Sequence, residues 1–224
     1  MGVNRIGFGI IDDVVVQEAS KQEIIRRYFE TESNYKKGLT DIDALNRMQI
    51  IMEELDLKPE DRNCVAPARQ YSERLKSLPE WDQEFTPPVM ALELTDGTII
   101  TGRGSELMDA SASALLNAIK TLANISDEIL LLSPNILEPI QKLKTKELDG
   151  RVTSLNISEI LIALSISAVT NPTAQLAYGK LSELKDGQAH STVILNKDDE
   201  QVLRSLGISS TCDPNFPSKN LYYI

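Results

Sequence analysis

Two apolar segments separated by an Asp-Gly pair constrain the fold of this chain more than any other feature. Residues 89–95 (VMALELT) and 98–103 (TIITGR) each read as a strand, and Asp96-Gly97 lies between them. A two-residue type I′ turn needs positive φ at both central positions, and Asp-Gly meets that need at low cost. The pattern therefore predicts a β-hairpin that closes through a type I′ turn.

The segment before the hairpin has helical periodicity. Apolar residues recur at helical spacing over residues 15–35, 40–55 and 66–78, and Thr40 is the expected cap of the second helix. The second helix has the expected apolar stripe Ile42, Leu45, Met48, Ile51, Met52 and Leu55. Residues 8–11 are expected to form a brief extended segment. Pro79, Pro87 and Pro88 favour a linker, so we expect a helical subdomain at 1–87 and an α/β subdomain at 88–224.

The segment after the hairpin alternates between helical and strand patterns. Asn156 and Glu159 form a capping-box pattern, and Pro172 suits a first helical turn. The expected helices are 105–123, 129–146 (broken or shifted at Pro134 and Pro139), 157–169, 172–184 and 198–206, and the expected strands are 189–195 and 208–212. A hairpin followed by strands that alternate with helices predicts a mixed sheet covered by helices, an α/β (mixed α+β) fold.

Charge and cysteine content exclude several classes of partner. The 224 residues carry 33 acidic and 23 basic side chains, a net charge of −10, which opposes binding to a phosphate backbone. No apolar run approaches the roughly 20 residues of a membrane span, and no signal-peptide pattern is present. Cys64 and Cys212 are the only cysteines, which predicts a reduced, cytoplasmic chain. We therefore expect no nucleic-acid or membrane partner.

Metal and cofactor sites have little support in the sequence. A zinc site normally needs several histidine or cysteine ligands, and this chain has one histidine and two isolated cysteines. No metal site is predicted, but the many acidic residues leave a carboxylate-only magnesium site open as an alternative. No complete cofactor motif identifies a cofactor.

The first candidate site is Gly102-Arg103-Gly104-Ser105, at the end of the hairpin. Glycines allow close backbone approach, and free amides at a helix start can hold an anion beside Arg103. The pattern is neither a P-loop nor a dinucleotide fingerprint. A turn followed by a helix cap is the simpler interpretation of Gly104 and Ser105.

The second candidate is His190-Ser191-Thr192, with Thr192 as a candidate ligand-binding residue. Histidine titrates near neutral pH and serine is a potential nucleophile, so His190 and Ser191 are the catalytic candidates. Adjacent residues of a regular strand point to opposite faces, so these two would not form a dyad, and His190 would share a face with Thr192. A hydrogen-bonded structural histidine is the simpler interpretation.

The third candidate is the polar junction between two helices, with Asn171, Thr173 and Gln175 as candidate ligand-binding residues. Hydroxyls and amides here could line a pocket, with Thr173 donating to an anion. Helix capping and packing of small residues account for the same residues, and the sequence leaves both interpretations open.

Several of these segments resemble a known family. They are Asn171-Pro172-Thr173-Ala174-Gln175, His190-Ser191-Thr192, Gly2-Val3-Asn4-Arg5 and Leu206-Gly207-Ile208. Together they are similar to a family of uncharacterised bacterial proteins, a domain of unknown function, some of whose members carry the label ATP-dependent peptidase. The resemblance spans essentially the whole chain. It implies that this chain is the carboxy-terminal half of longer proteins, as a fragment or a split product, with an α/β domain upstream of it.

The resemblance also implies a helical subdomain followed by an α/β subdomain whose topology is similar to that of cytidine deaminases. The deaminase chemistry does not follow, because Thr192 stands two residues after His190 and Cys212 leads into Asp213-Pro214 without a second cysteine. No Walker motif in these residues supports the peptidase label.

Two functional hypotheses follow. In the first, the chain is part of a two-part enzyme or ligand-binding protein, and the three candidate sites face a cleft that holds a small or phosphate-bearing molecule. In the second, the chain is a non-catalytic assembly module. The helix at 157–169 and the amino-terminal helices would then pack against another subunit of a homo-oligomer.

Overall fold

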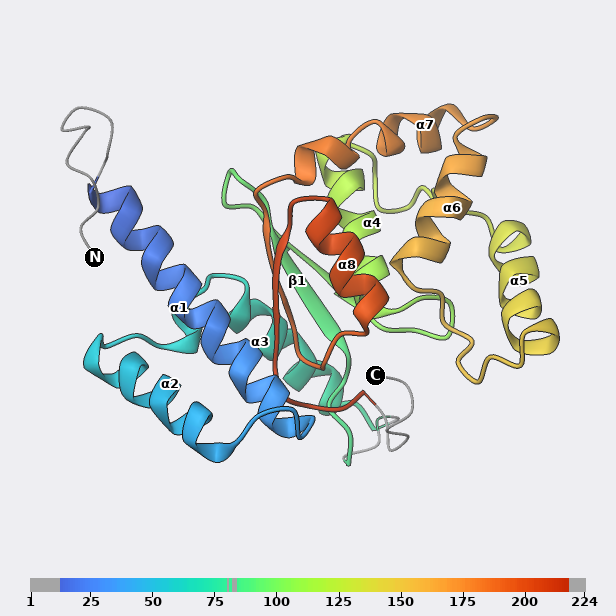
Figure 1. The fold of residues 1–224 in the computed structure, drawn as a ribbon. Helices are drawn as coiled ribbons and strands as arrows, with labels where there is room; N and C mark the ends of the chain where they lie inside the picture. The colour runs from blue at the N-terminus through green and yellow to red at the C-terminus, as the bar shows by residue number, and fades with distance from the viewer. Residues whose placement is uncertain (1–12, 80, 82–83, 218–224) are drawn as a thin grey trace. The chain divides into compact units, whose positions relative to one another are not determined.

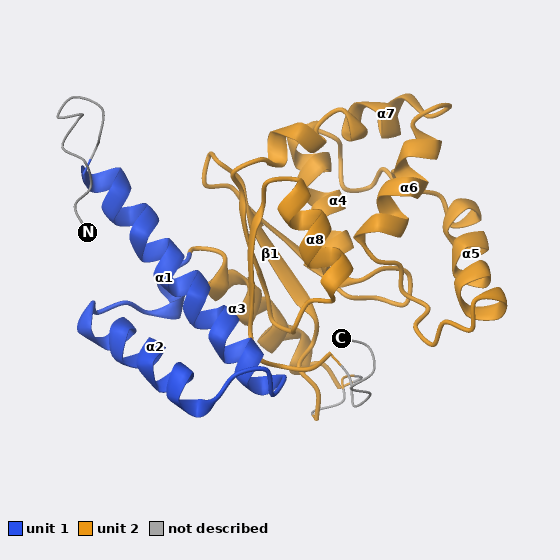
Figure 2. Cartoon of the chain, in the orientation of Figure 1, with its two compact units in different colours: residues 1–62 blue, residues 63–224 orange. Residues whose placement is uncertain are grey.

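A computed structural model describes residues 13–79, 81 and 84–217, and Figure 1 shows the course of the chain. The described residues fall into two compact units, residues 1–62 and 63–224, which are coloured separately in Figure 2. Each unit is considered by itself below. The expected extended segment at residues 8–11 lies outside the described residues.

Unit 1 contains the helices α1 (Asp13–Lys36) and α2 (Ile42–Glu54), which contact each other, and a 3₁₀ turn at Pro59–Asp61. Both helices were expected from periodicity. The cap of α2 is Asp41 rather than Thr40: Asp41 has an extended backbone, and its carboxylate accepts a hydrogen bond from the Ala44 amide at 2.8 Å. A carboxylate at this position also complements the positive end of the helix dipole.

Unit 2 is built on a four-stranded sheet. Its strands are β1 (Val89–Glu93), β2 (Ile99–Arg103), β3 (Gln188–Ser191) and β4 (Ser209–Cys212), in the order β2-β1-β3-β4. β1 runs antiparallel to both of its neighbours, whereas β3 and β4 are parallel. The mixed sheet covered by helices is therefore confirmed, and the deaminase-like topology stays a prediction.

The hairpin is present, but its turn is not type I′. Glu93 pairs with Ile99, the Leu94 amide donates to the Thr98 carbonyl at 2.9 Å, and the turn comprises residues 95–97. Only Gly97 has a positive φ, of 82°. A three-residue turn with glycine in the left-handed position leaves Asp96 in an ordinary conformation, and the Asp96 side chain accepts from the Thr98 amide at 2.9 Å.

The two faces of the sheet are covered differently (Figure 1). On one face, Val89 and Ala91 pack with Cys64, Ala68 and Leu75, the last two from α3 (Val65–Lys76). On the other, Met90 and Leu92 join a larger core. That core is formed with α4 (Ala110–Leu122), α6 (Ile157–Ser167), α7 (Pro172–Tyr178) and α8 (Lys197–Ser205). Alternate β1 residues thus serve two cores.

Several helix boundaries differ from expectation. α4 begins five residues later than predicted, because residues 104–109 form a loop. The expected helix at 129–146 begins at Pro134: α5 (Pro134–Lys142) keeps Pro139 inside it and continues as a π-helical turn at Leu143–Glu147. α7 ends at Tyr178, and a separate 3₁₀ turn spans Leu181–Leu184. The predicted capping box at Asn156 and Glu159 is confirmed.

The units divide after Arg62, so α3 belongs to the unit that contains the sheet, where it contacts β1 and β3. The domain boundary predicted at 87–88 would instead place α3 in the amino-terminal helical subdomain. That boundary stays a prediction. Within the described part of the chain, no helix combines the length and the apolar character that crossing a bilayer requires.

Candidate functional site

A pocket of about 540 Å³ lies in unit 2, where β2 approaches α3 and α4. α3 contributes Tyr71 and Arg74, β2 contributes Thr101, Gly102 and Arg103, and α4 contributes Ser113, Leu116, Asn117 and Lys120. The loops supply Ser105, Met108, Asp127 and residues 129–132. Its volume falls in the range of small-molecule sites.

The pocket carries positive charge in a chain whose net charge is −10. Arg74, Arg103 and Lys120 line it, against one lining carboxylate, that of Asp127. Arg74 lies over the ring of Tyr71, 5.6 Å from its centroid. Lys120 is buried, and its Nζ donates to the backbone carbonyl of Asp127 at 2.9 Å, which holds the ammonium beside the pocket. This arrangement suits an anionic ligand.

The first predicted site contributes three residues to this pocket, although not in the expected way. Gly102 is required by packing: a Cβ there would lie 2.1 Å from the Ala114 amide nitrogen of α4. The amides of Gly104 and Ser105 donate to the carbonyls of Pro88 and Met108, both at 2.9 Å. The expectation of free amides at a helix start is therefore wrong. The side chain of Arg103, which is exposed, lines the pocket, and its role in binding an anion stays a prediction.

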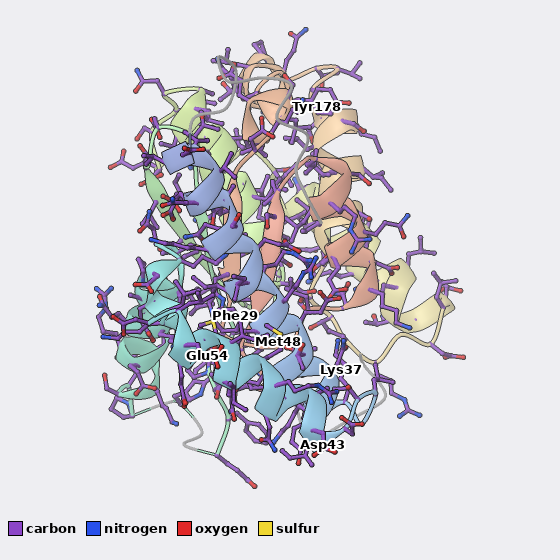
Figure 3. The ribbon with its side chains drawn as sticks, turned by 60° about the vertical axis from the view of Figure 1, so that its left-hand side comes forward. Phe29, Lys37, Asp43, Met48, Glu54 and Tyr178 are labelled. Atoms are coloured by element: carbon purple, nitrogen blue, oxygen red, sulfur yellow. The ribbon has the colours of Figure 1, made fainter. Side chains whose placement is uncertain are left out.

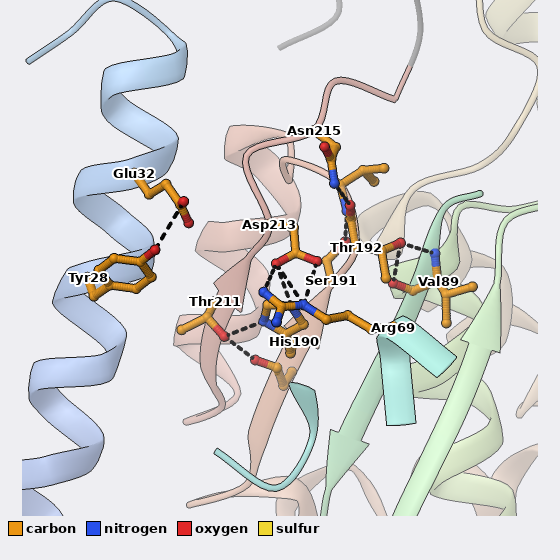
Figure 4. Close-up of polar contacts among 12 residues, drawn as sticks. Tyr28, Glu32, Arg69, Val89, His190, Ser191, Thr192, Thr211, Asp213 and Asn215 are labelled. Carbon is orange, nitrogen blue, oxygen red and sulfur yellow. Dashed lines mark hydrogen bonds and ion pairs between the residues drawn. The ribbon is translucent and has the colours of Figure 1, made fainter. Parts of the chain in front are cut away.

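The second predicted site is part of a buried charged network (Figure 4). His190 is fully buried on the α3 face of β3, and its Nδ1 lies 2.9 Å from the Thr211 hydroxyl. Its Nε2 lies 3.4 Å from the carboxylate of Asp213, and Arg69 of α3 binds the same carboxylate at 2.6 Å. Burial raises the pKa of Asp213, but hydrogen bonds from His190 and Arg69 outweigh this effect, so the pKa lies below its ordinary value.

The hydrogen-bond partners fix how His190 is oriented. His190 Nδ1 lies 2.9 Å from the Thr211 hydroxyl, which is also 3.2 Å from the carbonyl of Ala189, and the tautomer of the ring decides whether Nδ1 donates or accepts. Nε2 faces the Asp213 carboxylate. Ser191 lies on the opposite face of the strand, as the pleat predicts, and its hydroxyl oxygen accepts from the Val193 amide at 3.3 Å. His190 and Ser191 are thus not arranged as a dyad.

Thr192 follows the end of β3 and ties two segments together. Its hydroxyl donates to the Pro87 carbonyl at 2.8 Å and accepts from the Val89 amide at 3.0 Å. These bonds anchor the start of β1 to β3.

The third predicted site is formed largely by helix capping. The Asn171 side chain accepts from the amides of Thr173 and Ala174, at 3.0 and 3.3 Å, at the start of α7. The Thr173 amide is therefore already engaged, whereas the Gln175 side chain is exposed. Neither this segment nor residues 190–192 line the pocket described above. A single cleft that joins all three predicted sites stays a prediction.

A second polar cluster joins the starts of three helices. The carboxylate of Asp199, in the first turn of α8, accepts from the Ser111 hydroxyl of α4 and from the Ile157 amide of α6, the latter at 3.0 Å. Asp199 is 1% exposed, and burial is the main reason why its pKa is raised. Sequence reasoning missed this cluster, because only the Asn196-to-Asp199 capping spacing marks it.

The described residues contain no cluster of side chains suited to bind a metal ion. No group of three or more His, Cys, Asp or Glu side chains in residues 13–79, 81 and 84–217 is placed to hold an ion.

Comparisons with known proteins place the chain in a family. Residues 60–222 match the model described as "Domain of unknown function DUF1846, C-terminal", and residues 1–56 match its N-terminal counterpart. A UPF0371 protein of Clostridioides difficile is 64% identical over 223 residues. UPF0371 proteins of Clostridium tetani and Clostridium botulinum are each 59% identical over the same length. Each match covers all of this chain but only 44% of the relative.

Proposed function

Because the chain belongs to the DUF1846 family and spans less than half the length of the relatives it matches, we propose that it is the ligand-binding part of a two-part bacterial protein. The ligand we propose is a small, phosphate-bearing molecule, bound in the pocket between β2, α3 and α4. The observation that supports this most is the concentration of Arg74, Arg103 and Lys120 around a cavity of about 540 Å³ in an acidic chain.

The pocket offers two kinds of contact. Arg74 and Arg103 present guanidinium groups, which bind phosphate oxygens through paired, charge-assisted hydrogen bonds. Leu116 and residues 129–132 supply an apolar wall for the rest of the ligand. Both arginines are exposed, so their attraction for an anion is screened by salt. We therefore expect binding to weaken as ionic strength rises.

A binding role fits the described residues better than catalysis does. His190 is fully buried and hydrogen-bonded, and Ser191 faces away from it. Catalytic roles for His190 and Ser191 remain predictions. The sequence has only two cysteines, Cys64 and Cys212, and both are buried, which supports the proposed reducing, cytoplasmic setting.

A thermal-shift screen tests the proposal. The panel contains inorganic pyrophosphate, AMP and glucose 6-phosphate, with adenosine and glucose as uncharged counterparts. A ligand at a hundredfold excess over its dissociation constant stabilises the fold by about 2.7 kcal/mol, which corresponds to about 5–10 °C for a chain of this size. We expect a shift of this kind with at least one phosphorylated compound and none with its uncharged counterpart. If every phosphorylated compound leaves the melting temperature unchanged, the proposal fails.

A second candidate function, that of an assembly module, is favoured by the outer face of α6. Ile162 and Ile166 are 59% and 62% exposed, and they lie opposite the buried residues of this helix. Val169, two residues beyond the end of α6, is 83% exposed. A helix that is apolar all round is normally buried on all sides. Multi-angle light scattering of the wild type and of the Ile162→Ser/Ile166→Ser variant distinguishes the roles. An oligomer that becomes a monomer in the variant supports assembly, whereas a wild-type monomer excludes self-assembly through this face.

A further inference from the structure

The apolar stripe of α2 is wider than the part of it that is buried. Of the six stripe residues expected from the sequence, Leu45 and Met52 are buried, at 7% and 5% exposure. Ile51 and Leu55 are 38% and 52% exposed, and Met48 is half-buried. Figure 3 shows α2 from the side on which Asp43, Met48 and Glu54 are labelled.

Met48, Ile51 and Leu55, the last of which is the C-cap residue of α2, form one continuous surface, called the α2 face here. Their spacings of three and four residues place them within an arc of about 60° on a helix of 3.6 residues per turn. That arc adjoins the buried positions Leu45 and Met52. The α2 face therefore extends the buried stripe outward, as expected for a helix that packs against a second element.

The family comparison indicates what that second element is. Residues 1–56, which contain α1 and α2, match the amino-terminal family model, and the match to the carboxy-terminal model begins at residue 60. This division falls close to the division of the structure into units after Arg62. More than half of each relative's length lies outside the match to this chain, since the match covers 44%.

Unit 1 is also too small to support a large core by itself. It has 62 residues, and few of its described side chains are buried. Domains of this size are marginal when they fold alone. We propose that the α2 face is the docking surface for the remainder of the family's amino-terminal domain, which packs on Met48, Ile51 and Leu55. This inference does not depend on the pocket of unit 2, so it can fail or hold independently of the proposed ligand.

The test measures the accessibility of the α2 face in the short chain and in a full-length relative. Cysteine is introduced by Ile51→Cys in this chain and at the aligned position of the Clostridioides difficile protein, which is 64% identical. Alkylation by a maleimide under native conditions is followed by mass spectrometry of the peptide that carries the new cysteine. Cys64 and Cys212 are buried, so their background reaction is slow. The matched control is Ile50→Cys, because Ile50 is 52% exposed and lies about 100° away on the same helix.

We expect the two cysteines to react at similar rates in the short chain. In the full-length relative, the cysteine aligned with residue 51 is expected to react at least about tenfold more slowly than in the short chain, while the control changes by less than about threefold. Equal rates at position 51 in both proteins would overturn the proposal. In the short chain, a cysteine at position 51 that reacts more slowly than the control at position 50 would also overturn the proposal. The α2 face would then be covered without the remainder of the amino-terminal domain.

A second measurement identifies the occupant. Sedimentation velocity is run on the short chain and on the Ile51→Glu/Leu55→Glu variant. A short chain that stays monomeric over the concentration range supports the proposal, because no second copy then covers the α2 face. Self-association of the short chain that the variant abolishes would show that a second copy occupies the face, and would refute it. An α-helical circular dichroism signal equal to that of the wild type confirms that the variant is folded.

Discussion

Asp199 holds together the starts of three helices, and its removal should therefore cost more than an average substitution. The carboxylate accepts from the Ser111 hydroxyl and from the Ile157 amide, and Asp199 is 1% exposed. Hydrogen bonds to a charged group contribute about 1.5–3 kcal/mol each. Two such bonds give about 3–6 kcal/mol, and part of this is offset by the cost of keeping a carboxylate buried. We expect Asp199→Ala to lower the free energy of unfolding by about 3 kcal/mol.

The isosteric variant separates the hydrogen bonds from the charge. Asp199→Asn keeps one acceptor oxygen and the shape of the side chain, and it removes the buried charge. We therefore expect it to cost less than about 1.5 kcal/mol, near the value for one neutral hydrogen bond. Urea denaturation of the wild type and both variants at pH 7, followed by circular dichroism, measures these differences. An Asn variant as unstable as the Ala variant, or an Ala variant as stable as the wild type, would refute the reasoning.

The pH dependence of the stability difference between the wild type and Asp199→Asn gives an independent check. Burial raises the pKa of Asp199 in the folded state above its ordinary value of 3.8. The folded state therefore binds a proton more readily than the unfolded state, so the stability contributed at this site falls as pH rises between those two pKa values. Relative to Asp199→Asn, the wild type should gain stability as the pH is lowered from 7 toward 4. A constant difference across this range would contradict the assigned shift.

Two further predictions concern the sheet. Gly102→Ala should lower stability by about 3 kcal/mol, the upper end for overpacking, because its Cβ would lie 2.1 Å from a backbone nitrogen of α4. Gly97→Ala should lower stability by about 1 kcal/mol, because a Cβ at Gly97 meets no neighbouring atom but the φ of 82° strains an alanine. Equal melting temperatures for the Gly102→Ala and Gly97→Ala variants would contradict this. Asp213→Asn should lower the free energy of unfolding by about 2 kcal/mol at pH 7, because it breaks the ion pair with Arg69. This value is below that for a fully buried ion pair, because the Arg69 side chain is 35% exposed. Because the folded-state pKa of Asp213 is lowered, the wild-type advantage should disappear as pH falls below about 4, in pH-dependent urea unfolding.

Local signals predicted the elements of the fold well. The hairpin, the helix periodicities and the Asn156 capping box depend on neighbouring residues, so the sequence carries them directly. The turn type was wrong because Asp-Gly suits both a two-residue turn and the last two positions of a three-residue turn. The choice between them depends on the register of the strands, which local sequence does not specify. The predicted start of α4 at residue 105 was wrong for a similar reason. Ser105 does not cap the helix but accepts a hydrogen bond from the Met108 amide within a loop.

The candidate site was predictable only in part. Arg103 was found because it lies in a glycine-rich segment at a strand end, whereas Arg74 and Lys120 lie on helices with no distinguishing motif. Their approach to Arg103 depends on how α3 and α4 pack against β2. The role of Gly102 was misjudged for the same reason, because the group that needs the space is the α4 backbone. Capping residues such as Asn171 carry the same sequence signature as ligand-binding residues.

The most direct test of the proposed function is a calorimetric titration with inorganic pyrophosphate at low and at physiological salt. The wild type is compared with the Arg74→Gln/Arg103→Gln variant and with Arg151→Gln, which removes an exposed arginine outside the pocket. We predict that the double variant binds at least about tenfold more weakly, that Arg151→Gln matches the wild type, and that wild-type affinity falls as salt rises. Equal affinities for the wild type and the double variant, or no binding by the wild type at either salt concentration, would contradict the account.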